Sequence, residues 1–247
     1  MAKGDLAIRT PDNLSDEEAA TLGVAVSTVG QGLYQALKLP LPTAPATDSP
    51  PILIWGGATA TGLLGIQFAA LSGYQVHATS SPAQFDYLRS LGAAAVYDYR
   101  SPSVSADIKA ATGGKLKVAW DCVASEETGR AAAEALADEG GAYASLLPVP
   151  DEVIHGASAS ATNALTLAYT VFGEPFEKFK AFPAVPADYE FAKTFWELSR
   201  GLLAEGKIRP ARGFVNRDGK KGLEGVLAGL QELREDKVRG GKLVYTL

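Results

Sequence analysis

The stretch that decides the fold is Ile52-Leu53-Ile54-Trp55-Gly56-Gly57-Ala58-Thr59-Ala60-Thr61-Gly62. Its first four residues are all apolar, as is typical of a strand buried on both faces of a parallel sheet. The small residues that follow let backbone N–H groups approach a phosphate at the positive N-terminus of a helix. The strict G-x-G-x-x-G pattern is absent, and a tight turn can also need glycine for conformational reasons alone.

After this stretch, strands and helices alternate with short turns between them. We expect strands at 52–55, 75–79, 94–97, 117–122 and 141–147, and helices at 61–71, 82–91, 103–111 and 126–137. Such βαβ alternation predicts an α/β fold, a Rossmann-type doubly wound parallel sheet. This context makes a dinucleotide-binding role for the glycine-rich turn more probable than a purely structural one.

The flanking regions are less regular. Before the sheet we expect a helical region over 16–37, broken near Gly23 and Gly30, with Ser15 and Glu18 forming a capping box at its start. After the sheet, residues 163–172 could be strand or helix. We further expect helices at 189–206 and 221–234 and a strand at 242–247.

Composition narrows the class of protein. The 247 residues carry a formal net charge of -5 and no long Lys/Arg run, which argues against a nucleic-acid or anionic-membrane surface. The single cysteine, Cys122, excludes an internal disulfide and the usual cysteine-built structural zinc site. No signal peptide and no membrane-spanning stretch is recognisable, so we expect a soluble cytoplasmic protein.

The end of the second expected strand discriminates between cofactors. NAD-specific folds usually place Asp or Glu about 20 residues after the glycines, to bind the ribose 2′-hydroxyl. Residues 79–84 contain hydroxyl groups and no acid there, which favours NADPH, since a carboxylate would repel its 2′-phosphate. Tyr99 and Arg100 could cover the adenine and pair with that phosphate. The alternative is that Ser81-Pro82 only caps a helix.

Taken together, these motifs resemble the medium-chain dehydrogenase/reductase superfamily. The closest likeness is to its zinc-free branch, which includes fungal trans-acting enoyl reductases and quinone-oxidoreductase-like proteins. The resemblance rests on residues 54–62 and on the segments Ala78-Thr79-Ser80-Ser81-Pro82, Phe85-Asp86, Ser90-Leu91-Gly92-Ala93, Tyr97-Asp98-Tyr99-Arg100, Gly222-Leu223-Glu224, Leu230 and Lys242-Leu243-Val244-Tyr245.

The resemblance implies a bound NADP(H) and hydride transfer to an activated carbon–carbon double bond. The implied cofactor-binding residues are Gly57, Ala58, Thr59, Ala60, Thr61, Ser80, Ser81, Pro82, Ala83, Gln84, Tyr99, Leu146, Leu147, Val238 and Arg239. Many relatives carry a basic or polar residue where Ala83 stands, so one phosphate contact is expected to be missing.

By resemblance, the substrate side is lined by Thr28, Tyr169, Phe172 and Gly173. Two alternatives stay open: the Thr28 hydroxyl can instead bond its own helix backbone, and Tyr169 can be a packing aromatic. No catalytic residue can be assigned, since no Ser-His-Asp set can be assembled.

No metal is expected. Val24 stands where zinc-dependent relatives have a cysteine ligand, and the two histidines, His77 and His155, are too few to replace it.

Relatives also carry a GroES-like N-terminal domain before the equivalent of Gly4. The expected organisation is therefore a remnant of that domain at 1–14, an NADP-binding Rossmann domain at 15–183, and a segment at 184–247 that would pack on the catalytic domain. The apolar faces that include Phe191, Phe195, Trp196 and residues 243–245 would then be only partly covered. From this we expect a homo-oligomer or other self-association.

Two functions follow. The first is an NADPH-dependent, zinc-independent oxidoreductase acting on an enoyl or quinone-type small molecule, incomplete in this chain. The alternative is a catalytically silent NADPH-binding module or subunit. A degenerate fold that binds no cofactor also stays open because of Ala83.

Overall fold

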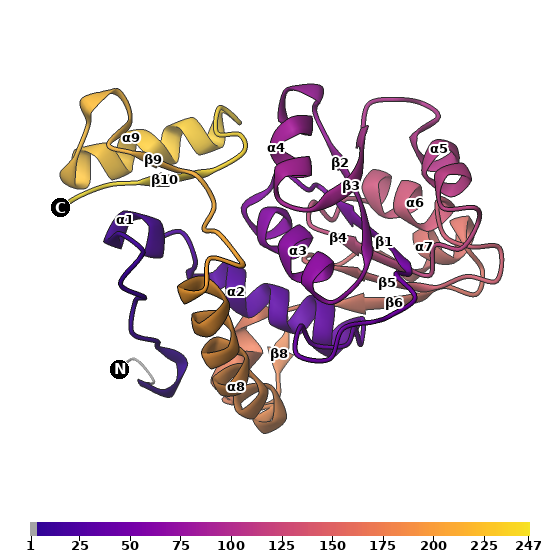
Figure 1. Cartoon of the computed structure of the whole chain (residues 1–247), viewed down its shortest axis with the longest axis horizontal. Helices are drawn as coiled ribbons and strands as arrows, with labels where there is room; N and C mark the ends of the chain where they lie inside the picture. Colours follow the sequence, from indigo (N-terminus) through magenta and orange to yellow (C-terminus); the bar gives the residue numbers. More distant parts are fainter. Residues whose placement is uncertain (1–3) are drawn as a thin grey trace.

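The computed structural model describes residues 4–247 and is built around one six-stranded parallel sheet. The strand order is β3-β2-β1-β4-β5-β6, so the chain starts in the middle of the sheet, moves to one edge and crosses back to the other (Figure 1). This confirms the predicted doubly wound fold. The strands are β1 (Pro51–Trp55), β2 (Gln75–Ser80), β3 (Ala93–Asp98), β4 (Val118–Asp121), β5 (Ala142–Ser145) and β6 (Thr162–Leu165).

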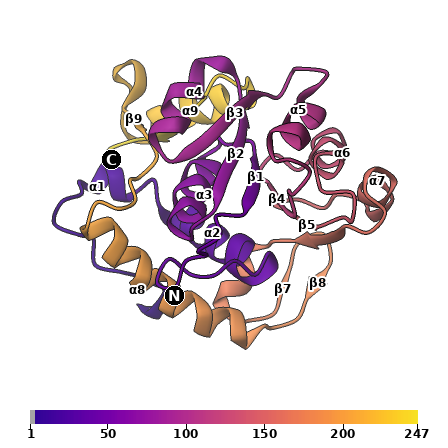
Figure 2. The ribbon, with the colours of Figure 1, turned by 45° about the vertical axis from the view of Figure 1, so that its right-hand side comes forward.

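Two hydrophobic cores lie on the two faces of the sheet, because successive side chains of a strand point to opposite faces. In β1, Ile52 and Ile54 enter one core, and Leu53 and Trp55 enter the other. The first face is covered by α2 (Gly23–Val29), α3 (Ala60–Leu71) and α4 (Phe85–Ser90), which follows the 3-10 turn η3 (Pro82–Gln84). The second face is covered by α5 (Val104–Ala111), α6 (Glu126–Glu134) and α7 (Asp151–Ala157), as Figure 2 shows.

The helical region before the sheet begins as expected. Ser15 accepts a hydrogen bond from the Glu18 amide, and Glu18 accepts one from the Ser15 amide, which confirms the capping box at the start of α1 (Asp16–Ala19). The chain is interrupted before Gly23, as predicted.

The predicted break near Gly30 is wrong. There α2 continues directly into a π-helix, η2 (Gly30–Ala36). The two glycines of this segment allow close packing: a Cβ on Gly30 would lie 2.7 Å from the Phe195 ring, and one on Gly32 would lie 2.5 Å from the Trp120 ring.

Residues 163–172, for which strand and helix were both left open, form the end of strand β6 followed by a short 3-10 helix, η4. Several predicted ends are wrong, since α6 ends at residue 134, β5 at 145 and β10 at 244. Two pairings were not predicted: the β7–β8 hairpin and the parallel pair of β9 with β10. The remaining elements are η1 (Gly4–Leu6), η4 (Ala168–Phe172), β7 (Phe176–Glu177), β8 (Ala181–Phe182), α8 (Pro186–Ala204), β9 (Gly213–Val215), η5 (Arg217–Gly219), α9 (Gly222–Arg234) and β10 (Lys242–Val244).

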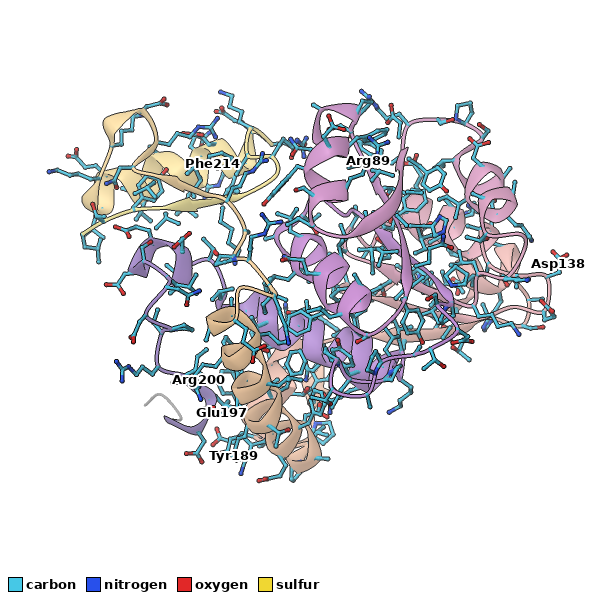
Figure 3. All side chains as sticks on the ribbon, viewed as in Figure 1. Arg89, Asp138, Tyr189, Glu197, Arg200 and Phe214 are labelled. Atoms are coloured by element: carbon cyan, nitrogen blue, oxygen red, sulfur yellow. The ribbon has the colours of Figure 1, made fainter. Side chains whose placement is uncertain are left out.

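The described part of the predicted segment 1–14 lies along α8, on the side that carries Tyr189, Glu197 and Arg200 (Figure 3). The Tyr189 hydroxyl donates to Asp5 over 2.7 Å, and the Asn13 amide donates to the Leu203 carbonyl over 3.0 Å. Residues 1–3 of that predicted segment lie outside the described residues. No helix in the described chain is long and apolar enough to cross a bilayer.

The expectation that Phe195 and Trp196 would be only partly covered is wrong. Their exposed fractions are 2% and 9%, because α8 packs against α2, η2 and α3. The Phe195 ring lies 5.3 Å from Tyr34 and 5.1 Å from Phe68 between centroids. Exposed apolar side chains lie instead on α9, where Leu223, Leu227, Leu230 and Leu233 face solvent. The predicted self-association stays a prediction.

The contact between Gly32 and Trp120 yields the first testable prediction. Gly32→Ala would force a methyl group against the fully buried Trp120 ring, and we expect it to lower the free energy of unfolding by about 1–3 kcal/mol, as overpacking does. The measurement is urea denaturation. Gly23→Ala is the matched control, because no atom lies within 4 Å of a Cβ there, and alanine favours the helix. Equal stability of Gly32→Ala and the control would contradict this packing.

Candidate functional site

A cleft of about 1100 Å³ opens at the carboxyl ends of β1, β2, β3 and β4, the edge at which doubly wound sheets bind ligands. Its other wall is the segment after α9. The cleft is lined by Trp55, Gly56, Ala58, Thr59, Ala60, Thr79, Ser80, Ser81, Gln84, Tyr99, Arg100, Ser101, Pro102, Val104, Ser105, Val123, Ser125, Glu127, Thr128, Ala131, Glu134, Leu233, Asp236, Val238, Arg239, Gly240, Gly241, Lys242 and Leu243. A smaller cavity of about 360 Å³ lies between residues 9–13 and α8.

The glycine-rich turn joins β1 to α3 at the floor of the cleft. Gly56 adopts φ +74°, a conformation that favours glycine. A Cβ on Gly62 would lie 2.4 Å from the Gly56 carbonyl oxygen, so only glycine lets the first turn of α3 pack this closely on the end of β1. Thr59 caps α3 by accepting from the Gly62 amide over 3.0 Å. The other amides of this first turn lack an intrahelical partner and suit an anion.

The turn after β2 places polar groups at one end of the cleft. Ser81 precedes η3, with Pro82 in its first turn, and its hydroxyl makes no capping hydrogen bond to the helix. The alternative that Ser81 serves as a side-chain cap therefore finds no support in the geometry. The Oε1 atom of Gln84 is buried and has no hydrogen-bond partner. An unpaired buried acceptor is costly, and the segment after α9 covers this one, since a Cβ on Gly240 would lie 2.5 Å from it.

Two of the arginines in the cleft are paired with carboxylates. Arg100 donates from Nε and Nη2 to Asp98 over 2.9 and 2.8 Å, and this hydrogen bonding holds the pKa of the Asp98 carboxyl below its usual value. Arg239 donates from Nη2 to Asp236, three residues earlier in the chain. The expected pairing of Arg100 with a 2′-phosphate would therefore compete with Asp98.

The loop from β4 to α6 forms the side of the cleft next to the glycine-rich turn. Fully buried Asp121 accepts hydrogen bonds from the amides of Val123 and Ala124, both over 2.9 Å. The same carboxylate accepts from Thr128 over 2.7 Å and from Tyr143 over 3.0 Å. These bonds hold the loop in place, and Ala124 takes φ +63° within it. Asp121 thus positions Val123 and Thr128 against the cleft.

Cys122 lies beside this loop and is buried. Burial, together with the neighbouring Asp121, raises the pKa of its thiol well above the usual range. The thiol therefore stays protonated, and because the thiolate is the nucleophile, the geometry argues against cysteine chemistry here.

The structure brings nine of the fifteen expected cofactor-binding residues to the cleft wall. These are Ala58, Thr59, Ala60, Ser80, Ser81, Gln84, Tyr99, Val238 and Arg239. Six others do not line it: Gly57, Thr61, Pro82, Ala83, Leu146 and Leu147. Gly57 instead donates its amide to the Thr79 carbonyl over 2.8 Å, which ties the turn to β2.

The expected substrate-side residues lie elsewhere in the molecule and do not line this cleft. The Thr28 hydroxyl donates to the Val24 carbonyl over 2.7 Å, as the alternative interpretation expected. Tyr169 and Phe172 are about half exposed on η4, and Gly173 ends that helix with φ +64°.

The segment around η4 is anchored by a partly buried carboxylate, that of Asp188. Thr170 donates to Asp188 over 2.5 Å, and Gln35 donates to Asp188 over 2.8 Å.

Val24, at the position where zinc-dependent relatives have a ligand, is exposed. Across residues 4–247, no three His, Cys, Asp or Glu side chains gather as a metal site would require.

Sequence reasoning missed several residues of the cleft wall, above all Val123, Thr128 and Lys242. Val123 and Thr128 follow a buried strand that ends in Asp121, and a carboxylate at a strand end was a usable signal. No local signal identified Lys242, because its place at the cleft depends on how residues 235–242 fold back after α9.

Comparison with known proteins agrees with the fold and with the expected family. Residues 60–181 match the zinc-binding dehydrogenase family. The chain is 44% identical over 268 residues to the trans-enoyl reductase resD of Aspergillus sclerotiorum, covering 99% of this chain and 71% of that protein. It is 40% identical to the trans-enoyl reductase ACTTS2 of Alternaria alternata, covering 100% and 69%.

A third relative is much longer than this chain. The match to the dual trans-enoyl reductase/FAD-dependent monooxygenase tazHJ of Aspergillus terreus is 48% identical and covers 93% of this chain, which spans about a third (32%) of that protein.

Solved structures show the same fold at low sequence identity. The CurK enoyl reductase superposes with a TM-score of 0.76 at 19% identity, covering 99% of this chain and 67% of that one. A putative NADPH:quinone reductase from Bacillus thuringiensis superposes with a TM-score of 0.75 at 18% identity, covering 100% and 69%. With the identity to resD and ACTTS2, the predicted family is confirmed: this chain belongs to the trans-enoyl reductases of the medium-chain dehydrogenase/reductase superfamily.

Proposed function

We propose that this chain binds NADPH in the cleft at the carboxyl edge of the sheet and serves an oxidoreductase that reduces an enoyl-type carbon–carbon double bond. The observation that carries the proposal is the cleft itself. It joins the N-terminus of α3, the acid-free turn after β2 and the segment 238–243 around one space of about 1100 Å³. The relatives named trans-enoyl reductase support the type of reaction.

Three features of the cleft fit a dinucleotide. The backbone around Gly56 and Gly62 leaves no room for a Cβ, so a pyrophosphate can lie against bare amides at the positive end of α3. At the other end, the Ser81 hydroxyl lines the cleft and makes no capping hydrogen bond, so it can bond a polar group of the adenosine half. Beyond the turn after β2, at the end of β3, Tyr99 is half exposed and offers an aromatic face to the adenine.

Bound NADPH would supply the hydride for the reduction. The residues of this chain bind it, orient it and limit access of water. Val123 and Thr128, held by Asp121, form the wall of the cleft on the side of β4, next to the glycine-rich turn. For the substrate side we propose the segment Tyr169–Gly173, fixed through Thr170 to Asp188.

The preference for NADPH over NADH can be tested by thermal shift. A ligand that binds only the folded state raises the free energy of unfolding by mass action, by about 2.7 kcal/mol at 100 times its Kd. The melting temperature rises with it. We expect NADPH to raise the melting temperature more than an equal concentration of NADH, because residues 79–84, at the end of β2 and in the turn after it, carry no carboxylate. An equal shift with both would contradict the assignment of the 2′-phosphate site, and no shift with either would contradict the cofactor site as a whole.

Turnover separates the oxidoreductase from a catalytically silent NADPH-binding module. We expect the protein to oxidise NADPH when it is given an α,β-unsaturated thioester, and not when it is given the saturated thioester as a control. The measurement is the loss of NADPH absorbance together with mass analysis of the reduced product. Binding of NADPH without any turnover would support the silent module instead.

A further inference from the structure

Three cationic side chains line the cleft, and they differ in their partners. Arg100 is held by Asp98 and Arg239 by Asp236, so both guanidinium charges are already balanced. Lys242 is different, because no carboxylate of the described chain lies within ion-pair distance of its ammonium group. It is the lysine whose charge is free to meet an anionic ligand in this cleft.

The surroundings of Lys242 make an unpaired charge costly. The side chain is partly buried, and burial lowers the pKa of its ammonium group because the charged form loses hydration with no counter-charge to replace it. The backbone is fixed: the Lys242 amide donates to the Arg212 carbonyl over 2.8 Å, and Lys242 pairs with Gly213 across β9 and β10. A charged group held this way suits a ligand that brings the opposite charge.

The backbone beside Lys242 reaches the turn after β2. A Cβ on Gly240 would lie 2.5 Å from Oε1 of Gln84, so the backbone at Gly240, two residues before Lys242, passes directly against that side chain. Ser81, whose hydroxyl makes no capping bond, belongs to the same turn and lines the same cleft. Lys242 therefore lines the same cleft as Ser81 and lies two residues from the point at which the segment after α9 meets Gln84.

We propose that Lys242 is the specificity-determining cation of this site and binds the ribose 2′-phosphate of the cofactor, together with the Ser81 hydroxyl. This inference rests on the proposed NADPH-binding function and deepens it. It also accounts for Ala83, whose exposed methyl group offers no charge from the turn after β2. The charge comes instead from β10, more than 150 residues later in the chain.

Fragments of the cofactor test this without any need for catalysis. Adenosine 2′,5′-bisphosphate and 5′-AMP differ only in the 2′-phosphate, and their Kd values can be measured by isothermal titration calorimetry. We expect the wild-type protein to bind the bisphosphate more tightly. Lys242→Met should raise the Kd of the bisphosphate by about 10- to 100-fold, the usual range for a lost charge-assisted contact. It should raise the Kd of AMP by less than about twofold.

Two further variants make the result specific. Lys242→Arg keeps the charge and should retain most of the preference for the bisphosphate. Lys220→Met removes an exposed lysine that does not line the cleft, and it should leave both Kd values unchanged. Melting temperatures of all variants check that each protein is folded.

The inference is overturned if Lys242→Met keeps the preference, or if it weakens AMP and the bisphosphate equally, which would indicate a structural role. Loss of the preference in Arg100→Met or Arg239→Met but not in Lys242→Met would assign the phosphate to another cation. If the wild-type protein binds AMP and the bisphosphate equally, Lys242 loses its role while dinucleotide binding stands. If it binds neither, the proposed function falls as well.

Discussion

The contact on which the rest of the site depends is the one between the first turn of α3 and the end of β1. It is a contact of bare backbone, since a Cβ on Gly62 would meet the Gly56 carbonyl oxygen at 2.4 Å and the Gly57 Cα at 2.9 Å. Because no side chain separates the two elements, the unpaired amides at the N-terminus of α3 lie at the carboxyl edge of the sheet. That edge is where the cleft opens, and the positive helix end gives it a preference for anions.

Neighbouring elements hold this contact from two sides. The Gly56 amide donates to the Thr79 hydroxyl over 2.9 Å, which ties the turn to the end of β2. On the other side, a Cβ on Gly56 would come 2.7 Å from Val123, so the loop after β4 packs on the turn as closely as glycine allows. That loop is in turn fixed by the buried carboxylate of Asp121. The glycine-rich turn, the end of β2 and the loop after β4 are therefore parts of one rigid arrangement.

How much could be predicted depended on the range of the interactions involved. The alternation of apolar strands such as 52–55 with helices is a local pattern, and it predicted the doubly wound parallel sheet, whereas the strand order and the two cores were seen only in the structure. The Ser15–Glu18 capping box is local too, and it was found. The continuation of the helix through Gly30 was missed, because glycine there serves a contact with Phe195, a residue 165 positions away. The position of Lys242 at the cleft and the burial of Trp196 were not predicted for the same reason: both depend on contacts between residues far apart in the sequence.

The central claim is that the cleft around Gly56, Ser81 and Lys242 is the dinucleotide site. Hydrogen–deuterium exchange with and without NADPH tests it most directly, because it reports each backbone segment separately. The account predicts slower exchange on NADPH binding at 56–63, 80–86 and 238–243, with residues 9–13 and 200–204 around the smaller cavity unchanged. Protection around the smaller cavity with none at 56–63 would contradict it.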